Sequence, residues 1–256
     1  MYCGIIGFPL KKPRSIKIWK KFFKKKKINN RMIPIEVNPK NFSKKIHTLK
    51  NDKEFRAAAI TMPYKENVYK KIIPGDKFSK ISKSVNLILK KDSNLYGYNT
   101  DIFGALEEIK KIYKKNILIY GYGGTGKAIF LNLIKMYKKS NYTILSQKKI
   151  SSKKRNVLFK KRSEISKKLL QNLDLFINCS PRGSDLKKNY LKLSPLKNSD
   201  FKFLKKSCVI FDIIYSPKKT KLYFQSKKNN ISYTNGLGMN SLQASKSLKI
   251  ITKFLK

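Results

Sequence analysis

The stretch Ile117-Leu-Ile-Tyr-Gly121-Tyr-Gly123-Gly124-Thr-Gly126-Lys127-Ala128 decides the fold of this 256-residue chain. Its apolar start predicts a strand, Gly-x-Gly-x-x-Gly predicts a tight turn, and the apolar run from Ala128 to Ile134 predicts a helix. A dinucleotide-binding fingerprint requires this context: Gly121 makes the turn, Gly123 lets the backbone approach a pyrophosphate, and Gly126 allows close helix–strand packing. The N-terminus of the helix offers free N–H groups and a positive dipole end to the phosphates.

Two other interpretations compete at this turn. The spacing of Gly121, Gly126 and Lys127 also matches most of a P-loop, which would indicate nucleoside triphosphate chemistry. A P-loop places a Ser or Thr hydroxyl next for magnesium, and this chain has Ala128 there, which disfavours that reading. The remaining alternative is a glycine turn that binds no ligand.

The residues after the next predicted strand favour NADP(H) over NAD(H). A free ribose 2′-hydroxyl is normally held by Asp or Glu about 20 residues beyond the glycines. No acidic residue occurs between Glu108 and Glu164. Hydroxyl, amide and ammonium groups that suit a 2′-phosphate follow the strand instead: Ser146, Gln147, Lys148 and Lys149.

On either side of this unit, short apolar runs alternate with amphipathic stretches, which is typical of α/β folds with parallel strands. The predicted strands are Tyr2–Phe8, Met32–Val37, Ala57–Thr61, Val85–Leu89, Ile117–Tyr120, Tyr142–Leu145, Leu175–Asn178, Val209–Ile213 and Ile231–Thr234. The predicted helices are Ser15–Phe23, Phe42–Leu49, Ile102–Lys111, Gly126–Lys138, Ile165–Leu170, Lys219–Lys227 and Leu242–Phe254. A new strand–turn–helix unit begins after Asp101–Lys115, so we expect an α/β protein of two domains.

The composition is strongly basic, with 60 Lys and Arg against 14 Asp and Glu and a net charge of +46. Hydrophobic residues at 41% and aromatic residues at 12% exclude a disordered polycation. Only six of the cations are Arg, the residue that nucleic-acid readers favour, and Lys is spread over the whole chain. A general drift toward Lys is therefore favoured over a specific nucleic-acid surface.

The three cysteines have neither a closed disulfide framework nor metal-ligand spacing, so we expect a reducing, cytoplasmic compartment and no metal. No apolar run approaches the length of about 18 residues that a membrane span needs.

Polar side chains follow or precede several of the apolar runs, where open α/β sheets build their sites. Thr61 and Lys65 follow one predicted strand, Asn86 lies near the start of another, and Asp101 precedes a helix. A Lys–Asp pair in a cleft can transfer protons, with the carboxylate orienting the amine. Asp101 has an alternative reading as the N-cap of the helix that follows it.

Nine short motifs in order along the chain resemble those of the shikimate dehydrogenase family. They are Gly7-Phe-Pro-Leu10, Thr61-x-Pro63-Tyr-Lys65, Val85-Asn86, Gly97-Tyr-Asn99-Thr100-Asp101, Gly121-Tyr-Gly123-Gly124, Asn178-Cys-Ser180-Pro-x-Gly183, Asp212-Ile-Ile-Tyr215-Ser-Pro217, Gly236-Leu-Gly238-Met239 and Gln243-Ala244. The match is collinear from about Tyr2 to Phe254.

The resemblance implies an NADP-dependent enzyme that reversibly reduces 3-dehydroshikimate to shikimate, a step toward chorismate and the aromatic amino acids. It implies a substrate-binding domain over 1–101, completed by 236–256, and a Rossmann-type NADP-binding domain over 102–235, with a cleft between them. Lys65 and Asp101 match the family's catalytic pair. We expect a small-molecule substrate, no specific nucleic acid, no membrane, and a monomer or homodimer.

The resemblance also assigns the binding residues. Thr61, Asn86 and Gln243 match positions that hydrogen-bond the ring hydroxyls, and Ser15 and Tyr215 match positions that receive the carboxylate. The implied cofactor contacts are Gly121, Tyr122, Gly123, Gly124, Thr125, Ser146, Gln147, Lys148, Lys149, Ile213, Gly236 and Met239.

The chain departs from the family pattern at three places. The first hydroxyl of the Ser-x-Ser carboxylate clamp is replaced by Pro13, which leaves Lys12 or Arg14 as an alternative partner. The Asn before the Thr61 motif is Ala59, and an Asn-Arg-Thr phosphate motif is replaced by Ser-Gln-Lys at 146–148. The alternative substrate is therefore quinate or another carboxylated cyclic polyol. A catalytically inactive relative and a basic nucleic-acid-binding protein on this fold are less favoured.

Overall fold

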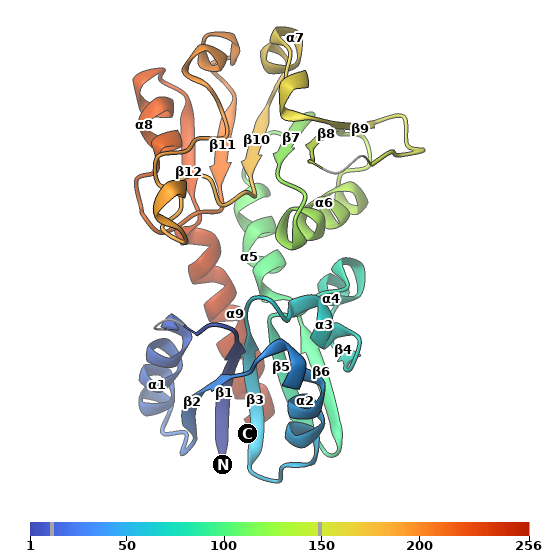
Figure 1. Cartoon of the computed structure of the whole chain (residues 1–256), viewed down its shortest axis with the longest axis vertical. Coiled ribbons are helices and arrows are strands. Elements are labelled where there is room, and N and C mark those ends of the chain that lie inside the picture. Colours follow the sequence, from blue (N-terminus) through green and yellow to red (C-terminus); the bar gives the residue numbers. More distant parts are fainter. Residues whose placement is uncertain (11–12, 148–149, 256) are drawn as a thin grey trace. The chain divides into compact units, whose positions relative to one another are not determined.

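Two six-stranded sheets carry the fold, one in each of two units of the chain (Figure 1). The first unit comprises Met1–Phe103 and Leu242–Lys256, and the second comprises Gly104–Ser241. The computed structural model describes residues 1–10, 13–147 and 150–255, and of Arg14 the backbone alone. Lys148 and Lys149, two of the predicted cofactor contacts, lie outside the described residues.

The sheet of the first unit is mixed, and its strand directions decide which loops share an edge. Its strands are β1 (Tyr2–Gly7), β2 (Arg31–Glu36), β3 (Phe55–Ile60), β4 (Ile73–Pro74), β5 (Leu87–Lys91) and β6 (Asn94–Tyr98), in the order β2-β1-β3-β5-β6-β4. β1, β2 and β3 are parallel, whereas β5 is antiparallel to both β3 and β6. β1, β3 and β6 therefore run in one direction, and the segments that follow them leave the same edge of the sheet.

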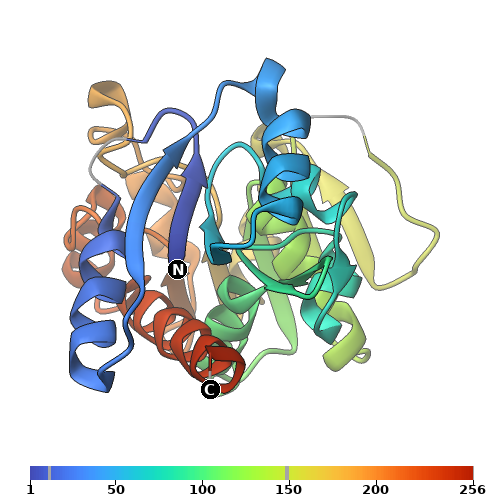
Figure 2. The ribbon, with the colours of Figure 1, turned by 90° about the horizontal axis from the view of Figure 1, so that it is seen from below.

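Helices cover both faces of this sheet, because its central strands are apolar on both sides. They are α1 (Arg14–Lys26), α2 (Phe42–Asn51), α3 (Lys65–Tyr69), α4 (Lys77–Ser82), the start of α5 (Thr100–Ile109), most of α9 (Leu237–Leu255) and the short 3-10 helix η1 (Pro39–Asn41). On one face, Trp19 of α1 and Ile251 of α9 pack with Cys3 of β1 (Figure 2). On the other face, Phe42 of α2 and Val68 of α3 pack with Ile6.

The second unit has a fully parallel sheet in the doubly wound order. Its strands are β7 (Asn116–Tyr120), β8 (Asn141–Leu145), β9 (Val157–Lys160), β10 (Leu175–Asn178), β11 (Val209–Asp212) and β12 (Ser232–Asn235), in the order β12-β11-β10-β7-β8-β9. The order reverses between β7 and β10, and open α/β sheets bind their ligands beyond the carboxyl ends of the strands at this point. The glycine turn that follows β7 lies there.

The helices of the second unit are α6 (Gly124–Met136), α7 (Lys167–Gln171), α8 (Lys221–Lys228) and the 3-10 helices η2 (Arg162–Glu164), η3 (Lys188–Tyr190) and η4 (Asn198–Phe203). Leu170 of α7 and Leu222 of α8 belong to one core cluster with Phe176 of β10. This packing fixes the sheet whose carboxyl edge carries the candidate cofactor residues.

The α/β prediction is confirmed, and each of the nine predicted strands and seven predicted helices overlaps an observed element; the bounds of β10 are as predicted, and the other elements have shifted ends. The strands β4, β6 and β9 and the helices α3 and α4 were not predicted. β5 also extends to Lys91, beyond the predicted end at Leu89. Lys90 fits inside this buried strand because its amine donates to the backbone oxygen of Asp52 at 2.5 Å.

Within the described part of the chain, no helix has the length and apolar character needed to cross a membrane. The described residues also contain no group of three or more His, Cys, Asp or Glu side chains arranged to hold a metal ion.

Candidate active site

Lys65 and Asp101 meet in the first unit. Lys65 begins α3, just after β3, and Asp101 lies in the first turn of α5, just after β6. The Lys65 Nζ lies 2.5 Å from the Asp101 Oδ2. Because β3 and β6 run in the same direction, both side chains arrive at one edge of the sheet. The side chains are 32% and 20% exposed, so a substrate can reach the pair from solvent.

Asn99, not Asp101, caps the helix that carries Asp101. The Asn99 Oδ1 accepts the backbone N–H of Ile102 at 3.1 Å, which is N-cap geometry. Its Nδ2 donates to the side chains of Ser82 and Ser84 at 3.2 and 2.9 Å and to the Ser84 carbonyl at 3.0 Å. The alternative reading of Asp101 as the cap is therefore wrong, and its carboxylate pairs with the Lys65 amine.

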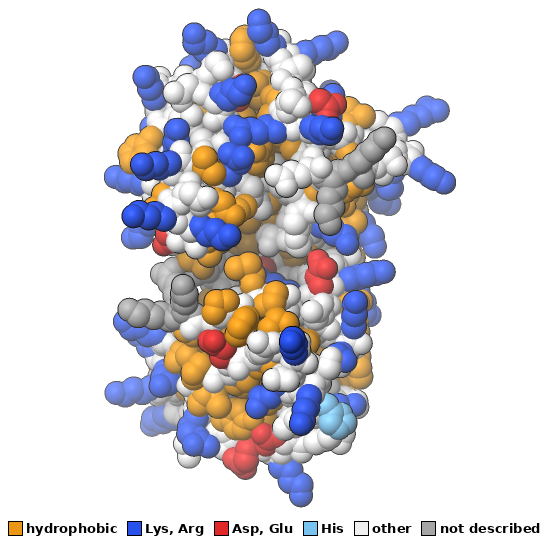
Figure 3. All heavy atoms as spheres, in the orientation of Figure 1, with side chains coloured by type: hydrophobic (Ala, Val, Ile, Leu, Met, Phe, Trp, Pro, Cys, Tyr) orange, Lys and Arg blue, Asp and Glu red, His pale blue; other side chains and the backbone are white. Residues whose placement is uncertain are grey.

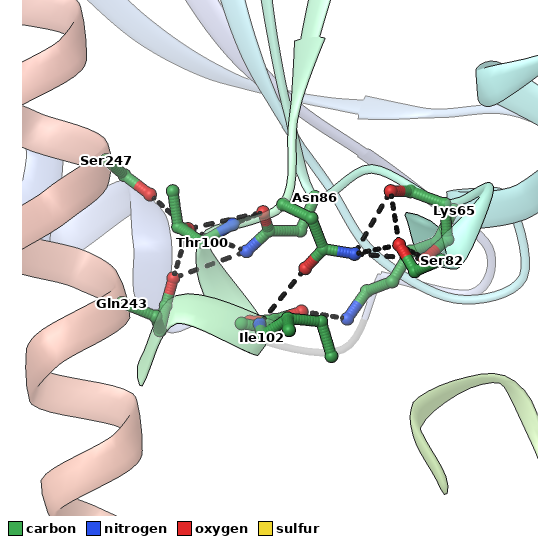
Figure 4. A network of polar contacts seen from close by, with 10 residues as sticks. Lys65, Ser82, Asn86, Thr100, Ile102, Gln243 and Ser247 are labelled. Carbon is green, nitrogen blue, oxygen red and sulfur yellow. Dashed lines mark hydrogen bonds and ion pairs between the residues drawn. The ribbon is translucent and has the colours of Figure 1, made fainter. Parts of the chain in front are cut away.

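Asn86, Thr100 and Gln243 form a polar network beside this pair (Figure 4). The Asn86 Oδ1 accepts the Thr100 N–H at 2.7 Å, and its Nδ2 donates to the Thr100 hydroxyl at 2.9 Å. The Gln243 Oε1 lies 3.4 Å from the Asn86 Nδ2 and 3.3 Å from the Thr100 hydroxyl. Ser247, one turn further along α9, contacts the Thr100 hydroxyl at 2.8 Å. Two predicted site residues, Asn86 and Gln243, are thus brought together by Thr100, which the sequence prediction did not include.

The turn before Lys65 is anchored by Tyr64. Its ring stacks on Phe42 with 4.1 Å between centroids, and its hydroxyl donates to the Val37 carbonyl. Thr61, at the start of the turn, donates its N–H to the Ile6 carbonyl at 2.9 Å and accepts the Tyr64 N–H at 3.1 Å. The aromatic residue between Pro63 and Lys65 was the available sequence signal for this anchor.

The predicted carboxylate partners lie in different units. Ser15 is half-buried in the first turn of α1, which follows β1 and so starts from the sheet edge shared with Lys65. Pro13 precedes this helix in an extended conformation. Lys12 and the side chain of Arg14 lie outside the described part of the structure. Tyr215 belongs to the second unit and is half-buried in the segment after β11.

The glycine turn of the second unit leaves open space at Gly123. Gly121 has a left-handed φ of 99°, and a Cβ on Gly126 would fall 2.0 Å from the Gly121 oxygen, so both glycines are needed by the turn itself. A Cβ on Gly123 would meet no atom within 4 Å. Gly123 also stands as N-cap of α6 without any side-chain cap. Open space above uncapped N–H groups is compatible with a phosphate ligand.

Neighbouring residues of the glycine turn differ in their surroundings. Gly124 is exposed and Thr125 is half-buried at the start of α6. The ring of Tyr122 packs edge-to-face on Phe159 of β9, with 5.1 Å between centroids. The Tyr122 side chain therefore also ties the turn to β9.

The chain after β8 lies beside the end of β9. Ser146 donates its N–H to the Lys160 carbonyl at 3.0 Å, and Gln147 is exposed. The backbone of Lys160, a residue that the prediction did not include, therefore lies beside Ser146. The absence of an acidic residue between Glu108 and Glu164 fits a 2′-phosphate.

The last predicted cofactor contacts lie near the end of β11 and the start of α9. Gly236 donates its N–H to the Ile214 carbonyl at 3.0 Å, and a Cβ there would fall 2.0 Å from the Ile213 oxygen. Ile213 is half-buried, and Met239 is 9% exposed in the first turn of α9. Ile213 and Gly236 are thus brought into contact.

Comparison with known proteins gives one consistent result. Residues 5–88 match the family model of the shikimate dehydrogenase substrate binding domain. The chain is 30% identical over 268 residues to the shikimate dehydrogenase (NADP(+)) of Methanocaldococcus jannaschii, with 97% of this chain and 90% of that relative covered. It is 30% identical over 256 residues to the enzyme of that name from Clostridium botulinum, with 94% and 92% covered. A crystal structure of a shikimate dehydrogenase in complex with NADP+ has a TM-score of 0.82 and 27% identity, over 98% of this chain and 90% of that one.

Proposed function

The chain belongs to the shikimate dehydrogenase family, and we propose that it catalyses the reversible, NADP-dependent reduction of 3-dehydroshikimate to shikimate. The observation that carries this proposal is the Lys65–Asp101 pair, with 2.5 Å between amine and carboxylate. Reducing a ketone to an alcohol requires a hydride and a proton. NADPH supplies the hydride when it is bound, and the chain must supply the proton.

Lys65 is the proton donor in this mechanism. As an ammonium it has three N–H groups, and one of them is held by Asp101. The carboxylate orients the amine and balances its charge, which leaves N–H groups to donate to the oxygen of the ketone. In the reverse direction the amine takes the proton back from the alcohol.

The ring hydroxyls are bound by the amide network. Asn86 precedes β5 and Gln243 belongs to α9, but their side chains are held together through Thr100. Amides that are already hydrogen-bonded lose little freedom when a substrate binds, so they orient its ring at low entropic cost. Thr61 supports the same function from the turn before Lys65. The substrate carboxylate is assigned to Ser15 and Tyr215.

The cofactor is assigned to the second unit. The residues that would hold it are those of the glycine turn, Gly121, Tyr122, Gly123, Gly124 and Thr125, together with Ser146, Gln147, Lys148, Lys149, Ile213, Gly236 and Met239. The open space at Gly123 supports the pyrophosphate assignment. The stretch without acids from Glu108 to Glu164 supports NADP(H). We therefore assign the substrate-binding domain to 1–101 with 236–256 and the NADP-binding domain to 102–235, and Gly236 and Met239, just beyond the latter, also contact the cofactor.

Two further expectations belong to this proposal. We infer a cytoplasmic location, which is supported by the three cysteines being free thiols. We also infer a monomer or homodimer that needs no membrane and no specific nucleic acid.

The test compares the oxidation of shikimate, quinate and a cyclic polyol without a carboxylate, each with NADP+. We expect shikimate to have the highest kcat/KM by at least about tenfold, which corresponds to roughly 1.4 kcal/mol of transition-state binding. A preference for quinate would show that the substrate is another carboxylated cyclic polyol, a change of specificity that Pro13 in the clamp position would allow. Equal rates for all three would overturn a carboxylate site.

A further inference from the structure

Asp212 is a buried carboxylate that the proposed chemistry does not use. It ends β11 and is 0% exposed. Burial raises the pKa of Asp212 to about 6, although the hydrogen bonds that it accepts act in the opposite direction. At neutral pH the group is therefore mainly an anion, and an anion in the protein interior must be satisfied by hydrogen bonds.

Four donors satisfy it, two on each oxygen. The Oδ1 accepts from the Asn178 Nδ2 at 3.0 Å and from the Ile214 backbone N–H at 3.2 Å. The Oδ2 accepts from the hydroxyls of Tyr233 and Thr220 at 2.9 and 3.1 Å. Asn178 ends β10, Thr220 is the N-cap of α8, and Tyr233 belongs to β12. One carboxylate thus joins three elements to the segment that follows β11.

That segment, residues 213–219, has no helix or strand of its own. Ile214 is buried, whereas Ile213 and Tyr215 on either side of it are half-buried. Besides the bond from Ile214 to Asp212, the Ile213 N–H donates to the Asn178 carbonyl at 3.2 Å. The carbonyls of Ile214 and Ser216 accept the N–H groups of Gly236 and Asp185 at 3.0 and 3.3 Å, and the Lys218 carbonyl accepts the Asn235 side chain at 3.3 Å. A segment without regular structure depends on such side-chain anchors for its position.

The same network reaches the glycine turn. The Asn178 Oδ1 accepts from the Ser180 N–H and hydroxyl at 3.0 and 2.7 Å. A Cβ on Gly121 would lie 3.1 Å from the Ser180 nitrogen, so this backbone packs closely on the turn. Asp212 is therefore linked through one residue to the backbone that supports the pyrophosphate site.

We propose that Asp212 is a positioning residue of the enzyme. Its carboxylate fixes the segment 213–217, so that Ile213 is placed to contact the cofactor and Tyr215 to contact the substrate. The proposal rests on the proposed function for the roles of those two residues. Asp212 contacts neither ligand in this scheme and acts through its four donors.

Asp174 provides a matched control for a purely structural effect. It is also a buried carboxylate of the second unit, but it precedes β10 and so lies at the opposite end of the strands. It pairs with Lys205 and accepts the Asn116 N–H at 2.7 Å. Asp174→Asn should lower stability without changing the segment 213–219.

The first measurement is amide hydrogen exchange on the cofactor-free protein. We expect exchange in the peptide covering residues 213–220 to be at least about tenfold faster in Asp212→Asn than in the wild type or Asp174→Asn. Tyr233→Phe removes a single donor and should give a smaller increase in the same peptide, which keeps the test available if Asp212→Asn folds poorly. Wild-type protection in both variants overturns the proposal.

The second measurement is kinetic. We expect Asp212→Asn to raise the KM for 3-dehydroshikimate and the Kd for NADP+ by about tenfold each, with both constants unchanged in Asp174→Asn. Faster exchange with unchanged KM and Kd would overturn the positioning role. A wild-type chain without any dehydrogenase activity would instead overturn the proposed function, and the exchange result would still decide whether Asp212 holds the segment.

Discussion

At the scale of single residues, the proposed reaction depends on the ammonium of Lys65. It lies 36 residues from Asp101 in sequence, and the directions of β3 and β6 bring the two side chains to one edge. Replacing Lys65 by Met removes the proton donor and keeps the length and apolar stem of the side chain. We expect kcat to fall by roughly 10²- to 10⁴-fold, the usual contribution of a positioned acid.

The control for Lys65→Met is Lys70→Met, which alters an exposed lysine at the end of the same helix and should keep wild-type kcat. The Kd for NADP+, measured by fluorescence titration, should be unchanged in both variants because the predicted cofactor contacts belong to the second unit. A Lys65→Met enzyme with near-wild-type kcat would remove Lys65 from its assigned role.

Ser15 tests the substrate carboxylate site. With Pro13 in place of a second hydroxyl, Ser15 is the remaining clamp residue on α1. Ser15→Ala should raise the KM for 3-dehydroshikimate by roughly tenfold, the effect of one hydrogen bond to a charged group, and change kcat less. Steady-state kinetics measure this directly, and an unchanged KM would mean that the carboxylate binds elsewhere.

Asp212 should give the stability of the protein a distinct pH dependence. Its pKa is about 6 in the folded chain, against 3.8 as the ordinary value, so the folded state holds the proton more tightly. The contribution of Asp212 to the free energy of unfolding is fully present below pH 3.8. It is lost as the pH rises toward 6, by about 3 kcal/mol in all. Tyr233 and Cys179 also face this group, but burial raises the pKa of each far above this range.

The measurement is the difference in melting temperature between wild type and Asp212→Asn from pH 4 to pH 7. Asparagine does not titrate, so the wild type should lose stability relative to the variant up to about pH 6 and then level off. A difference that is constant over this range would show that the carboxylate titrates alike in the folded and unfolded chains.

At the scale of elements, the cap of α5 connects helix stability to catalysis. Asn99→Ala removes the acceptor for the Ile102 N–H and the three bonds to Ser82 and Ser84, which should lower stability by about 1–3 kcal/mol. Because Asp101 lies in the first turn of this helix, kcat should fall as well.

Ser166→Ala is the control for this prediction, since Ser166 caps α7 in the second unit by accepting the Leu169 N–H at 3.2 Å. It should lower the melting temperature and leave kcat at the wild-type value. Equal kcat values in the two cap variants would show that the Asn99 cap does not position Asp101 for catalysis.

Elements with a complete local signal were predictable from sequence. The strand β7, its glycine turn and α6 follow one after another in the chain, and each supplies its own hydrophobic period or turn residue. β6 and the Asn99 cap were missed because their stability comes from distant partners. β6 is held by its antiparallel pairing with β5, and Asn99 is buried against Ser82 and Ser84.

The same distinction applies to the candidate site. Motif order proposed Lys65, Asp101, Asn86 and Gln243 as site residues, and the structure shows how they are held. Thr100 lies within one of the quoted motifs and Ser247 in none, and neither was predicted as a site residue, because a hydroxyl becomes part of a network only when α9 packs beside α5. Tyr215 and Ser15 belong to different units, so their joint action on one carboxylate stays a prediction.

At the scale of the whole molecule, the net charge of +46 is the dominant property. Lys and Arg side chains are spread over the face shown in Figure 3 and do not gather in one patch. Such a distribution repels itself in the folded chain, and salt screens this repulsion over a distance of about 10 Å at 0.1 M.

We therefore expect the melting temperature to rise as monovalent salt is added, and any binding to DNA to weaken toward physiological salt. Thermal unfolding in a salt series measures the first effect, and a DNA-binding titration in the same series measures the second. A melting temperature that falls with salt, or tight DNA binding that survives it, would point to a selected function for the charge.

The decisive measurement is the reduction of 3-dehydroshikimate by the purified wild-type chain, followed through the consumption of NADPH and, separately, of NADH. We expect turnover with NADPH and a kcat/KM at least about tenfold lower with NADH, because residues 109–163 contain no acid that would hold a free 2′-hydroxyl. Absence of turnover with either cofactor would contradict the proposed activity, and a preference for NADH would contradict the cofactor assignment.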